Sequence, residues 1–216
     1  SYYSSINPPI ENDVQEAQRM IKDNFDSKQF VVVVVPAGNY ENEKALLASY
    51  EAREEVDHAV GLSNTEALCG YTLTDELTPR QFSELIDLDY EVAELVYTAY
   101  AVDAIDFGKA VNGLPDYRVP LIDMFMFIHD EIEQGYVTLD DETQKTLDDA
   151  YKMMNFAKEQ LQGENYSRML VYLNLPEESP ETYEFIDRMH EMARQYYSGD
   201  IYTVGESVSQ LDLKIA

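Results

Sequence analysis

Histidine, cysteine and carboxylate side chains are the groups of this chain that could perform catalysis or bind a metal. The three histidines, His58, His129 and His190, fall far apart in the sequence, and none has a second histidine or cysteine at zinc-site spacing. Each is expected on its own helix, as an ordinary surface or partly buried side chain. The histidines therefore predict no metal site.

The single cysteine, Cys69, cannot form a disulfide within the chain, so the cysteine count does not indicate a compartment. No histidine neighbours Cys69 in the sequence to activate its thiol as a nucleophile. We predict that Cys69 is a small buried apolar residue.

Paired carboxylates are numerous but do not define a site. The pairs are Asp87/Asp89, Asp103/Asp106, Asp140/Asp141 and Asp148/Asp149. A calcium site needs oxygens that converge from a loop with a turn glycine, and the run from Thr138 to Glu142 lacks that pattern. That run fits a helix N-terminus, where acidic side chains complement the helix dipole. Asp148 and Asp149 are expected in mid-helix, facing solvent. A solvated acidic face is the preferred interpretation, with a cation site as the alternative.

Signatures of other enzyme classes are missing from the sequence. It contains no glycine-rich phosphate loop and no Gly-x-Ser-x-Gly elbow, and nothing sets two carboxylates at a defined separation. The sequence therefore predicts a protein that is not an enzyme, with no catalytic residue, no metal and no cofactor. A hydrolase that uses an acidic pair in a deep cleft is the least favoured hypothesis.

One apolar stretch, Met124-Phe125-Met126-Phe127, could form a soft and adaptable surface. On a helix only part of it can face the interior of its own lobe. The remainder would meet another helix, a partner or an apolar ligand, and simple core packing is the favoured interpretation.

The charge balance excludes some partners. The chain has 216 residues, 42 of them acidic and 15 basic, for a net charge of −27. Such a surface repels nucleic acid and anionic membranes. Because 45% of the residues are hydrophobic, the chain can bury a core. No segment has the uncharged apolar length that spans a bilayer. The chain opens on Ser1 without an initiator methionine, which suggests a piece of a longer protein.

The elements that would position these side chains begin with a helix from Ile10 to Phe25. Val14, Ala17, Ile21 and Phe25 form its apolar stripe. A buried strand follows over Phe30 to Val35, then a helix from about Asn42 to His58 and a second strand over Glu66 to Leu73. The helix from about Asn42 to His58 is expected to face the core with Leu46, Leu47, Tyr50 and Val56.

The same strand–helix–strand unit recurs near the other end of the chain. Ser167 to Leu175 is a strand, and Ser179 and Pro180 start a helix to Tyr197 as N-cap and first helical residue. A last strand covers Ile201 to Val204. Two such units predict an α+β fold, a ferredoxin-like split βαβ sandwich with a four-stranded sheet. The first and third strands would lie at the centre of the sheet. The two helices would cover one face, and another subdomain or partner the other.

A helical insertion separates the two units, giving residues 1–75 and 164–216 as one discontinuous domain and residues 76–163 as another. Thr78-Pro79 starts the first helix, which is expected to run past Tyr100 toward Asp103 and Gly108. The next runs from about Pro120 to Gln134 and stops at Gly135. The third runs from Asp140 to Gln162 and ends at Gly163.

These segments resemble one known family. Ile6-Asn7-Pro8-Pro9 through Phe25, with the strand that follows, is similar to the start of an extracytoplasmic loop in MMPL-type transporters of the RND superfamily. Tyr166 to Lys214 is similar to the close of that loop. Leu77-Thr78-Pro79 through Phe125 resembles the helical insertion in MMPL proteins of anaerobic Gram-positive bacteria. The resemblance covers nearly the whole chain and contains no catalytic signature.

The resemblance implies a function. The chain would be the extracytoplasmic domain of a proton-driven exporter of lipids, drugs or other amphiphiles, located at the outer face of the plasma membrane. Its partners would be the transmembrane helices and second extracytoplasmic loop of the same protein. An amphiphilic substrate and a homo-oligomer are further candidates. The alternative is a secreted acidic module that binds cations or a basic partner and has no transport role.

Overall fold

The computed structural model describes residues 29–105, 110 and 113–206. The helix expected from Ile10 to Phe25 lies outside the described residues. The described chain divides into two compact units. Residues 29–65 and 156–206 form what we call the sheet unit, and the described part of 66–155 forms the helical unit.

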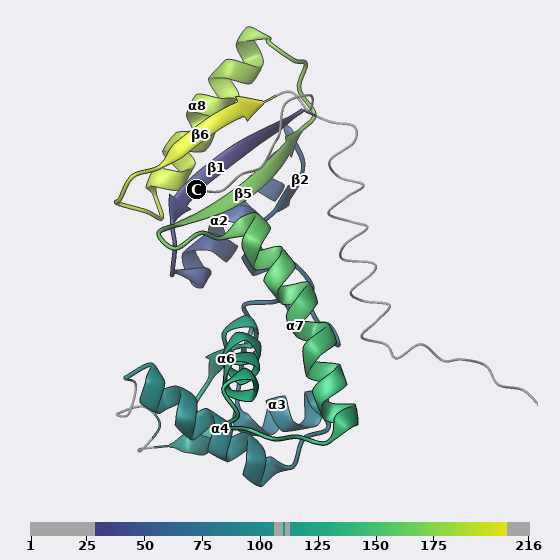
Figure 1. Ribbon diagram of the computed structural model, residues 1–216. Helices are drawn as coiled ribbons and strands as arrows, with labels where there is room; N and C mark the ends of the chain where they lie inside the picture. The colour runs from purple at the N-terminus through teal and green to yellow at the C-terminus, as the bar shows by residue number, and fades with distance from the viewer. Residues whose placement is uncertain (1–28, 106–109, 111–112, 207–216) are drawn as a thin grey trace, which may run out of the picture. The chain divides into compact units, whose positions relative to one another are not determined.

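The sheet unit has an α+β fold built on a four-stranded antiparallel sheet. The strands lie in the order β2-β5-β1-β6 (Figure 1). The elements of this unit are β1 (Phe30–Pro36), α2 (Tyr40–Glu51), β2 (Val56–Val60), the short 3-10 helix η1 (Leu62–Asn64), β5 (Tyr166–Leu173), α8 (Pro180–Arg194) and β6 (Tyr202–Glu206).

The centre of the sheet joins the two ends of the chain. β1 pairs with β5 along its whole length, from Phe30 opposite Tyr172 to Pro36 opposite Tyr166. β6 pairs with the other edge of β1, and β2 with the other edge of β5. The prediction that the first and third strands lie side by side at the centre is therefore confirmed.

One face of this sheet carries the core of the unit. Val31, Val33 and Val35 on β1 alternate with side chains on the opposite face, because successive side chains of a strand point to opposite sides. They pack with residues of β5, α2 and α8, among them Leu46, Leu47, Tyr50, Met169, Val171, Phe185 and Met189. Figure 1 shows α2 and α8 on the same side of the sheet.

Polar contacts also tie α2 to α8 and the turn that follows it. The Tyr50 hydroxyl donates to the carbonyl of Met189 at 2.9 Å, and Asn42 Nδ2 donates to the carbonyl of Tyr196 at 2.9 Å. Because the Tyr50 hydroxyl is buried, losing its partner would leave a polar group without water or protein to satisfy it. The two helices therefore pack in a fixed register.

The second strand lies earlier than the sequence predicted. α2 ends at Glu51, and Val56–Val60 pairs with β5, so the helix expected to reach His58 is too long. The backbone turns at Arg53, whose N–H donates to the carbonyl of Tyr50. The predicted strand over 66–73 is wrong, since Glu66 and Thr72 form only an isolated bridge. Short strands such as β2 carry a weak periodic signal, and the helical pattern upstream masked it.

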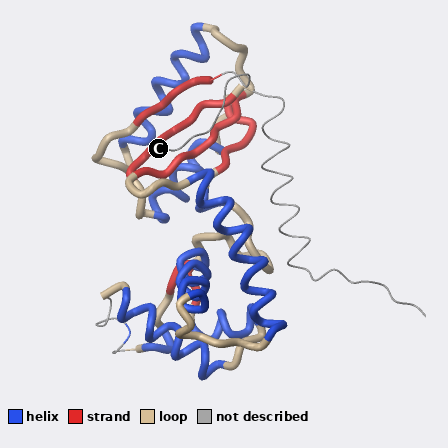
Figure 2. The backbone as a smooth tube through the Cα atoms, in the orientation of Figure 1, coloured by secondary structure: helices blue, strands red, loops and turns tan. Residues whose placement is uncertain are grey.

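The helical unit contains mostly helices, with one two-stranded pair (Figure 2). Its elements are β3 (Glu76–Leu77), α3 (Pro79–Ile86), α4 (Tyr90–Asp103), the 3-10 helix η2 (Leu114–Asp116), β4 (Val119–Pro120), α6 (Leu121–Glu133) and α7 (Asp141–Leu161), of which the last six residues belong to the sheet unit. The second and third predicted helices correspond to α6 and α7 and are confirmed. Gly135, with φ +79°, follows α6 as expected.

The first predicted helix of this unit is divided in two. α3 ends at Ile86, and Asp87 adopts a left-handed conformation with φ 53°. The N–H of Leu88 then donates to the carbonyl of Ser83, and α4 begins after Asp89. An aspartate tolerates this conformation better than most residues, which makes it a suitable helix end. The aspartate pair Asp87/Asp89 thus marks a break between helices.

Aromatic rings form much of the core of the helical unit. Phe82 on α3 lies 5.5 Å from Phe125 on α6 and 5.9 Å from Tyr97 on α4, between ring centroids. The Tyr97 hydroxyl is buried and donates to the carbonyl of Leu77 at 2.9 Å. The first pair is edge to face and the second is tilted, and aromatic pairs in such arrangements contribute beyond the area they bury. They hold three separate helices and β3 together.

Two of the predicted helix caps are confirmed. Thr78 accepts a hydrogen bond from the N–H of Gln81, whose side chain accepts from Thr78 in return. Ser179 accepts from the N–H of Thr182 at 3.2 Å, directly before Pro180. Each cap satisfies a backbone donor that the helix itself leaves unpaired.

The cap at Ser179 generates a stability prediction. Replacing Ser179 by Ala should lower the free energy of unfolding by about 1 kcal/mol, because the N–H of Thr182 loses its acceptor. Ser179→Asp should keep most of the stability, because a carboxylate caps equally well and its negative charge interacts favourably with the helix dipole at the N-terminus. Urea unfolding followed by circular dichroism measures both. Equal losses for the two variants would contradict the capping role.

Candidate functional site

The structure does not bring the three histidines together. His58 lies on β2, not on a helix as predicted, and its ring stacks on Tyr172 at 4.3 Å. His129 lies on α6 and stacks on Tyr151 at 3.4 Å. His190 lies on α8, half-buried. Among the described residues no three histidine, cysteine or acidic side chains form a group that could hold a metal ion.

The carboxylate pairs serve as helix ends or lie on helix surfaces. Asp140 accepts hydrogen bonds from the N–H and the hydroxyl of Thr143, at 2.9 and 2.8 Å. These bonds to the Thr143 backbone and side chain lower the pKa of the Asp140 carboxyl. The prediction of a helix N-terminus at this run is confirmed. Asp148 and Asp149 lie within α7, half-exposed, and Asp106 lies outside the described residues.

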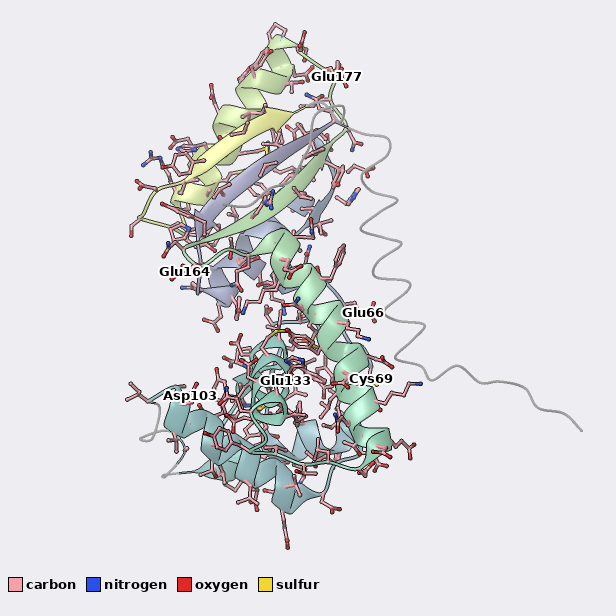
Figure 3. The ribbon with its side chains drawn as sticks, in the orientation of Figure 1. Glu66, Cys69, Asp103, Glu133, Glu164 and Glu177 are labelled. Atoms are coloured by element: carbon pink, nitrogen blue, oxygen red, sulfur yellow. The ribbon has the colours of Figure 1, made fainter. Side chains whose placement is uncertain are left out.

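Cys69 is exposed, so the prediction of a buried cysteine is wrong. It occupies a tight turn in which Cys69 and Gly70 both have positive φ, 50° and 81°. The turn closes through the N–H of Tyr71, which donates to the carbonyl of Leu68. At the tip of a turn a side chain points away from the chain that surrounds it. Cys69 is labelled in Figure 3, together with Glu66, which precedes this turn and bridges Thr72 across it.

The Met124–Phe127 stretch divides as a helix requires. Met124 and Phe125 are buried, while Met126 and Phe127 are half-buried. The ring of Phe127 contacts that of Tyr100 on α4 at 5.4 Å, edge to face. Phe127 therefore packs within its own unit, as the favoured interpretation of core packing predicts.

A buried carboxylate that the sequence reasoning missed is the most unusual group in the described chain. Glu43, in the first turn of α2, is 2% exposed. Its Oε1 accepts a hydrogen bond at 3.2 Å from the N–H of Leu62, the first residue of η1. The carboxylate therefore joins α2 to the backbone that follows β2. The sequence did carry a signal for this burial. Glu43 lies three, four and seven residues before Leu46, Leu47 and Tyr50, so it falls on the same face of the helix as these apolar residues.

Glycine at position 61 permits this contact. A Cβ atom built on Gly61 would lie 2.7 Å from Leu47 Cδ1 and 3.2 Å from Glu43 Oε1. The backbone of Gly61 is extended, so space and not conformation requires the glycine here. The backbone of η1 can approach α2 closely enough to donate to Glu43 because no side chain stands between them.

Burial dominates the electrostatics of this site. It raises the pKa of the Glu43 carboxyl from its ordinary 4.5 to about 7, against the opposing effect of the N–H groups of Leu62 and Ser63. Burial also raises the pKa of Tyr197, and the nearby Glu43 carboxylate raises it further. The side chain of Ser63 is fully buried, and the hydroxyl of Tyr197 is buried and makes no hydrogen bond. Several polar groups therefore share a region with little water.

This arrangement can hold a proton near neutral pH but is not built for turnover. A general acid or base must reach a substrate, and Glu43 is almost completely enclosed by α2, η1 and its neighbours. Protonation would instead change how strongly the carboxyl group accepts from Leu62, since an ionised acceptor makes the stronger hydrogen bond. At this site, binding of a proton by Glu43 is therefore coupled to the packing of α2 against η1.

Comparisons with known proteins add no identification. No family model matches the chain, and neither a curated protein nor a solved structure matches it. Among the described helices, none is long and apolar enough to cross a membrane.

The buried carboxyl predicts a specific dependence of stability on pH. Because the pKa of Glu43 is higher in the folded protein, the folded state binds this proton more tightly than the unfolded state does. The ionised group therefore costs stability fully above about pH 7 and not at all well below pH 4.5. Relative to Glu43→Gln, the wild type should lose about 3 kcal/mol of unfolding free energy as pH rises through this window.

The control for this measurement is Glu41→Gln, which removes the same charge from an exposed position of the same helix. Denaturant unfolding of the three proteins at several pH values and constant ionic strength gives the comparison. Parallel pH profiles for the wild type and Glu43→Gln would show that Glu43 has an ordinary pKa in the folded protein. A flat difference for Glu41→Gln is expected.

Proposed function

We propose that this chain is an extracytoplasmic domain of an RND-type, MMPL-like membrane exporter of lipids, drugs or other amphiphiles. The observation that carries the proposal is the strand order β2-β5-β1-β6 in an antiparallel sheet. This is the order of a ferredoxin-like split βαβ sandwich, with α2 and α8 as the two crossover helices. Between the two halves the chain inserts the helical unit.

Fold alone does not select a function, since ferredoxin-like sandwiches perform many unrelated tasks. The proposal therefore also rests on the resemblance of Ile6–Phe25, Leu77–Phe125 and Tyr166–Lys214 to extracytoplasmic loops of MMPL transporters. The net charge of −27 is consistent with that location, because Lys and Arg are retained on the cytoplasmic side of membrane proteins.

In this role the domain would work by conformational change. The sheet unit has one continuous core shared by β1, β5, α2 and α8, so it would move as a rigid body. The helical unit would supply a separate surface for contact with a partner or the substrate. The rest of the same transporter, including a second extracytoplasmic loop, would be the main partner.

The coding sequence on both sides of the chain tests this proposal. We expect apolar stretches of about 20 residues next to Ser1 and Ala216, long enough to span a bilayer. The full-length protein should sediment with membranes and resist extraction at alkaline pH. Protease added outside intact cells should cleave within residues 1–216. A product without flanking spans that is recovered in the culture medium would contradict the proposal and favour a secreted binding module.

A further inference from the structure

Helix α4 is apolar around most of its circumference. One side of it belongs to the core of the helical unit, where the buried residues are Ala93, Val96, Tyr97 and Ala101. The ring of Tyr97 lies 5.9 Å from that of Phe82 on α3, which fixes this side toward the interior. A helix that is hydrophobic on all sides is normally enclosed on all sides, and α4 is not.

The side of α4 opposite this core carries apolar residues that water reaches. Leu95 is 70% exposed and Val102 is 48% exposed. They lie seven residues apart, so they share one face of the helix. Val92 and Ala99 are partly exposed and fall beside them at spacings of three and four. We call Val92, Leu95, Ala99 and Val102 the α4 stripe.

Another long helix of the same chain presents charges to water instead. The exposed residues of α8 include Glu184, Asp187, Arg188 and Glu191. Between Val92 and Val102, in contrast, α4 has one charged residue, Glu94. Single apolar residues scattered over a surface need no explanation, but a continuous stripe in so charged a chain indicates an interaction surface.

The charges around the α4 stripe are acidic. From Pro79 to Asp103, which includes α3 and α4, the chain has six acidic residues and one basic residue, Arg80. The Arg80 guanidinium lies over the ring of Tyr90, 4.2 Å from its centroid. Glu91 and Asp103 are exposed and flank the stripe on opposite sides, near its two ends. Asp103 is labelled in Figure 3.

This charge distribution indicates the chemistry of the partner. A second copy of the chain would bring the same acidic residues against the stripe, and its net charge of −27 would repel the first copy. An anionic membrane surface would be repelled for the same reason. A partner with basic residues beside an apolar stripe would be attracted, because its charges complement those around α4.

The spacing of the stripe indicates the shape of the partner. Its gaps of three, four and three residues are those of a coiled-coil seam, in which each side chain fits between four side chains of the facing helix. The stripe is about 16 Å long, or about three helical turns, so three turns of a partner helix would cover it. An extended peptide has a repeat of two residues and does not match this spacing.

From these observations we propose that the α4 stripe is the docking surface for a basic amphipathic helix of a partner protein. Apolar side chains of that helix would pack between Leu95 and Val102, and its lysine or arginine residues would face Glu91 and Asp103. A contact of this small size is typical of transient association. The proposal concerns the helical unit and holds whether or not the chain belongs to a transporter, which the flanking coding sequence tests separately.

Fluorescence anisotropy with a defined probe tests the proposal on the whole chain. The probe is a labelled synthetic peptide of leucine and lysine, with its leucines at alternating gaps of three and four. A peptide of the same composition in scrambled order is its control. At an ionic strength of about 0.15 M, exposed charges attract only over short distances. The patterned peptide should then bind saturably in the micromolar range, and the scrambled peptide roughly tenfold more weakly or less.

Variants of the stripe locate the binding. Leu95→Glu and, separately, Val102→Glu should weaken binding of the patterned peptide roughly tenfold or more. Each adds a negative charge, which by itself attracts a basic peptide, so only the lost apolar contact accounts for weaker binding. Both positions are exposed and glutamate is a good helix former, so the circular dichroism spectrum and the unfolding midpoint should stay unchanged.

Tyr183→Glu is the matched control. Tyr183 lies on α8 and is 58% exposed, so this variant adds the same charge at an exposed apolar position outside the stripe. Its affinity for the patterned peptide should equal that of the wild type or exceed it slightly, through the added charge.

Four results would overturn the proposal. The first is failure of the patterned peptide to bind. The second is equal affinity of the wild type and both stripe variants, or of the two peptides, because binding would then follow charge alone. The third is a wild-type dimer in sedimentation equilibrium that Leu95→Glu dissociates, since a second copy would then cover the stripe. The fourth is binding to phosphatidylcholine vesicles that Leu95→Glu abolishes, which would assign the stripe to a lipid surface.

Discussion

The antiparallel pairing of β1 with β5 is the interaction on which the rest of the structure depends. It brings Phe30–Pro36 against Tyr166–Leu173, segments separated in the sequence by the whole helical unit. β2 and β6 have no place in the sheet without this central pair, because each adds to one of its two edges. Closing so long a loop costs chain entropy, which grows only slowly with loop length. The valines of β1, buried on both faces, offset that cost.

The pairing of β2 with β5, at one edge of this central pair, explains why a carboxylate can remain buried at Glu43. The β5–β2 pairing fixes the residues after β2, and η1 then lies close enough to α2 for the N–H of Leu62 to meet Glu43. Gly61 leaves the space for this approach. A buried ionisable group without such a fixed donor would cost more than a domain of ordinary stability can tolerate. Glu43 therefore reports on how rigidly the crossover from α2 through β2 is held.

Long and strongly patterned elements were predictable from the sequence. The valine run of β1, the strand of β5 and the helices α6, α7 and α8 were all recognised, because many residues contribute to each pattern. Tertiary contacts decided the features that were missed. β2 has five residues and becomes a strand by pairing with β5, and the helix break at Asp87 depends on one left-handed residue.

The candidate site was harder to predict than the fold. The exposure of Cys69 follows from two left-handed residues in a row, which its own sequence signals only through Gly70. The burial of Glu43 depends on η1, a short element placed by the strand before it. A carboxylate on an apolar stripe indicates burial or a helix end equally well, and Glu43 is both. Only the three-dimensional contacts show that Glu43 is buried as well as close to a helix end.

Nuclear Overhauser contacts between backbone protons of β1 and β5 test the central claim most directly. The account predicts cross-strand contacts in one antiparallel register, with Val31 opposite Val171 and Val33 opposite Met169. It also predicts that β2 and β6 give such contacts only with β5 and β1, respectively. Contacts of β1 with β2 in place of β5, or no contacts between residues 30–36 and 166–173, would contradict the architecture and remove the basis of the proposed function.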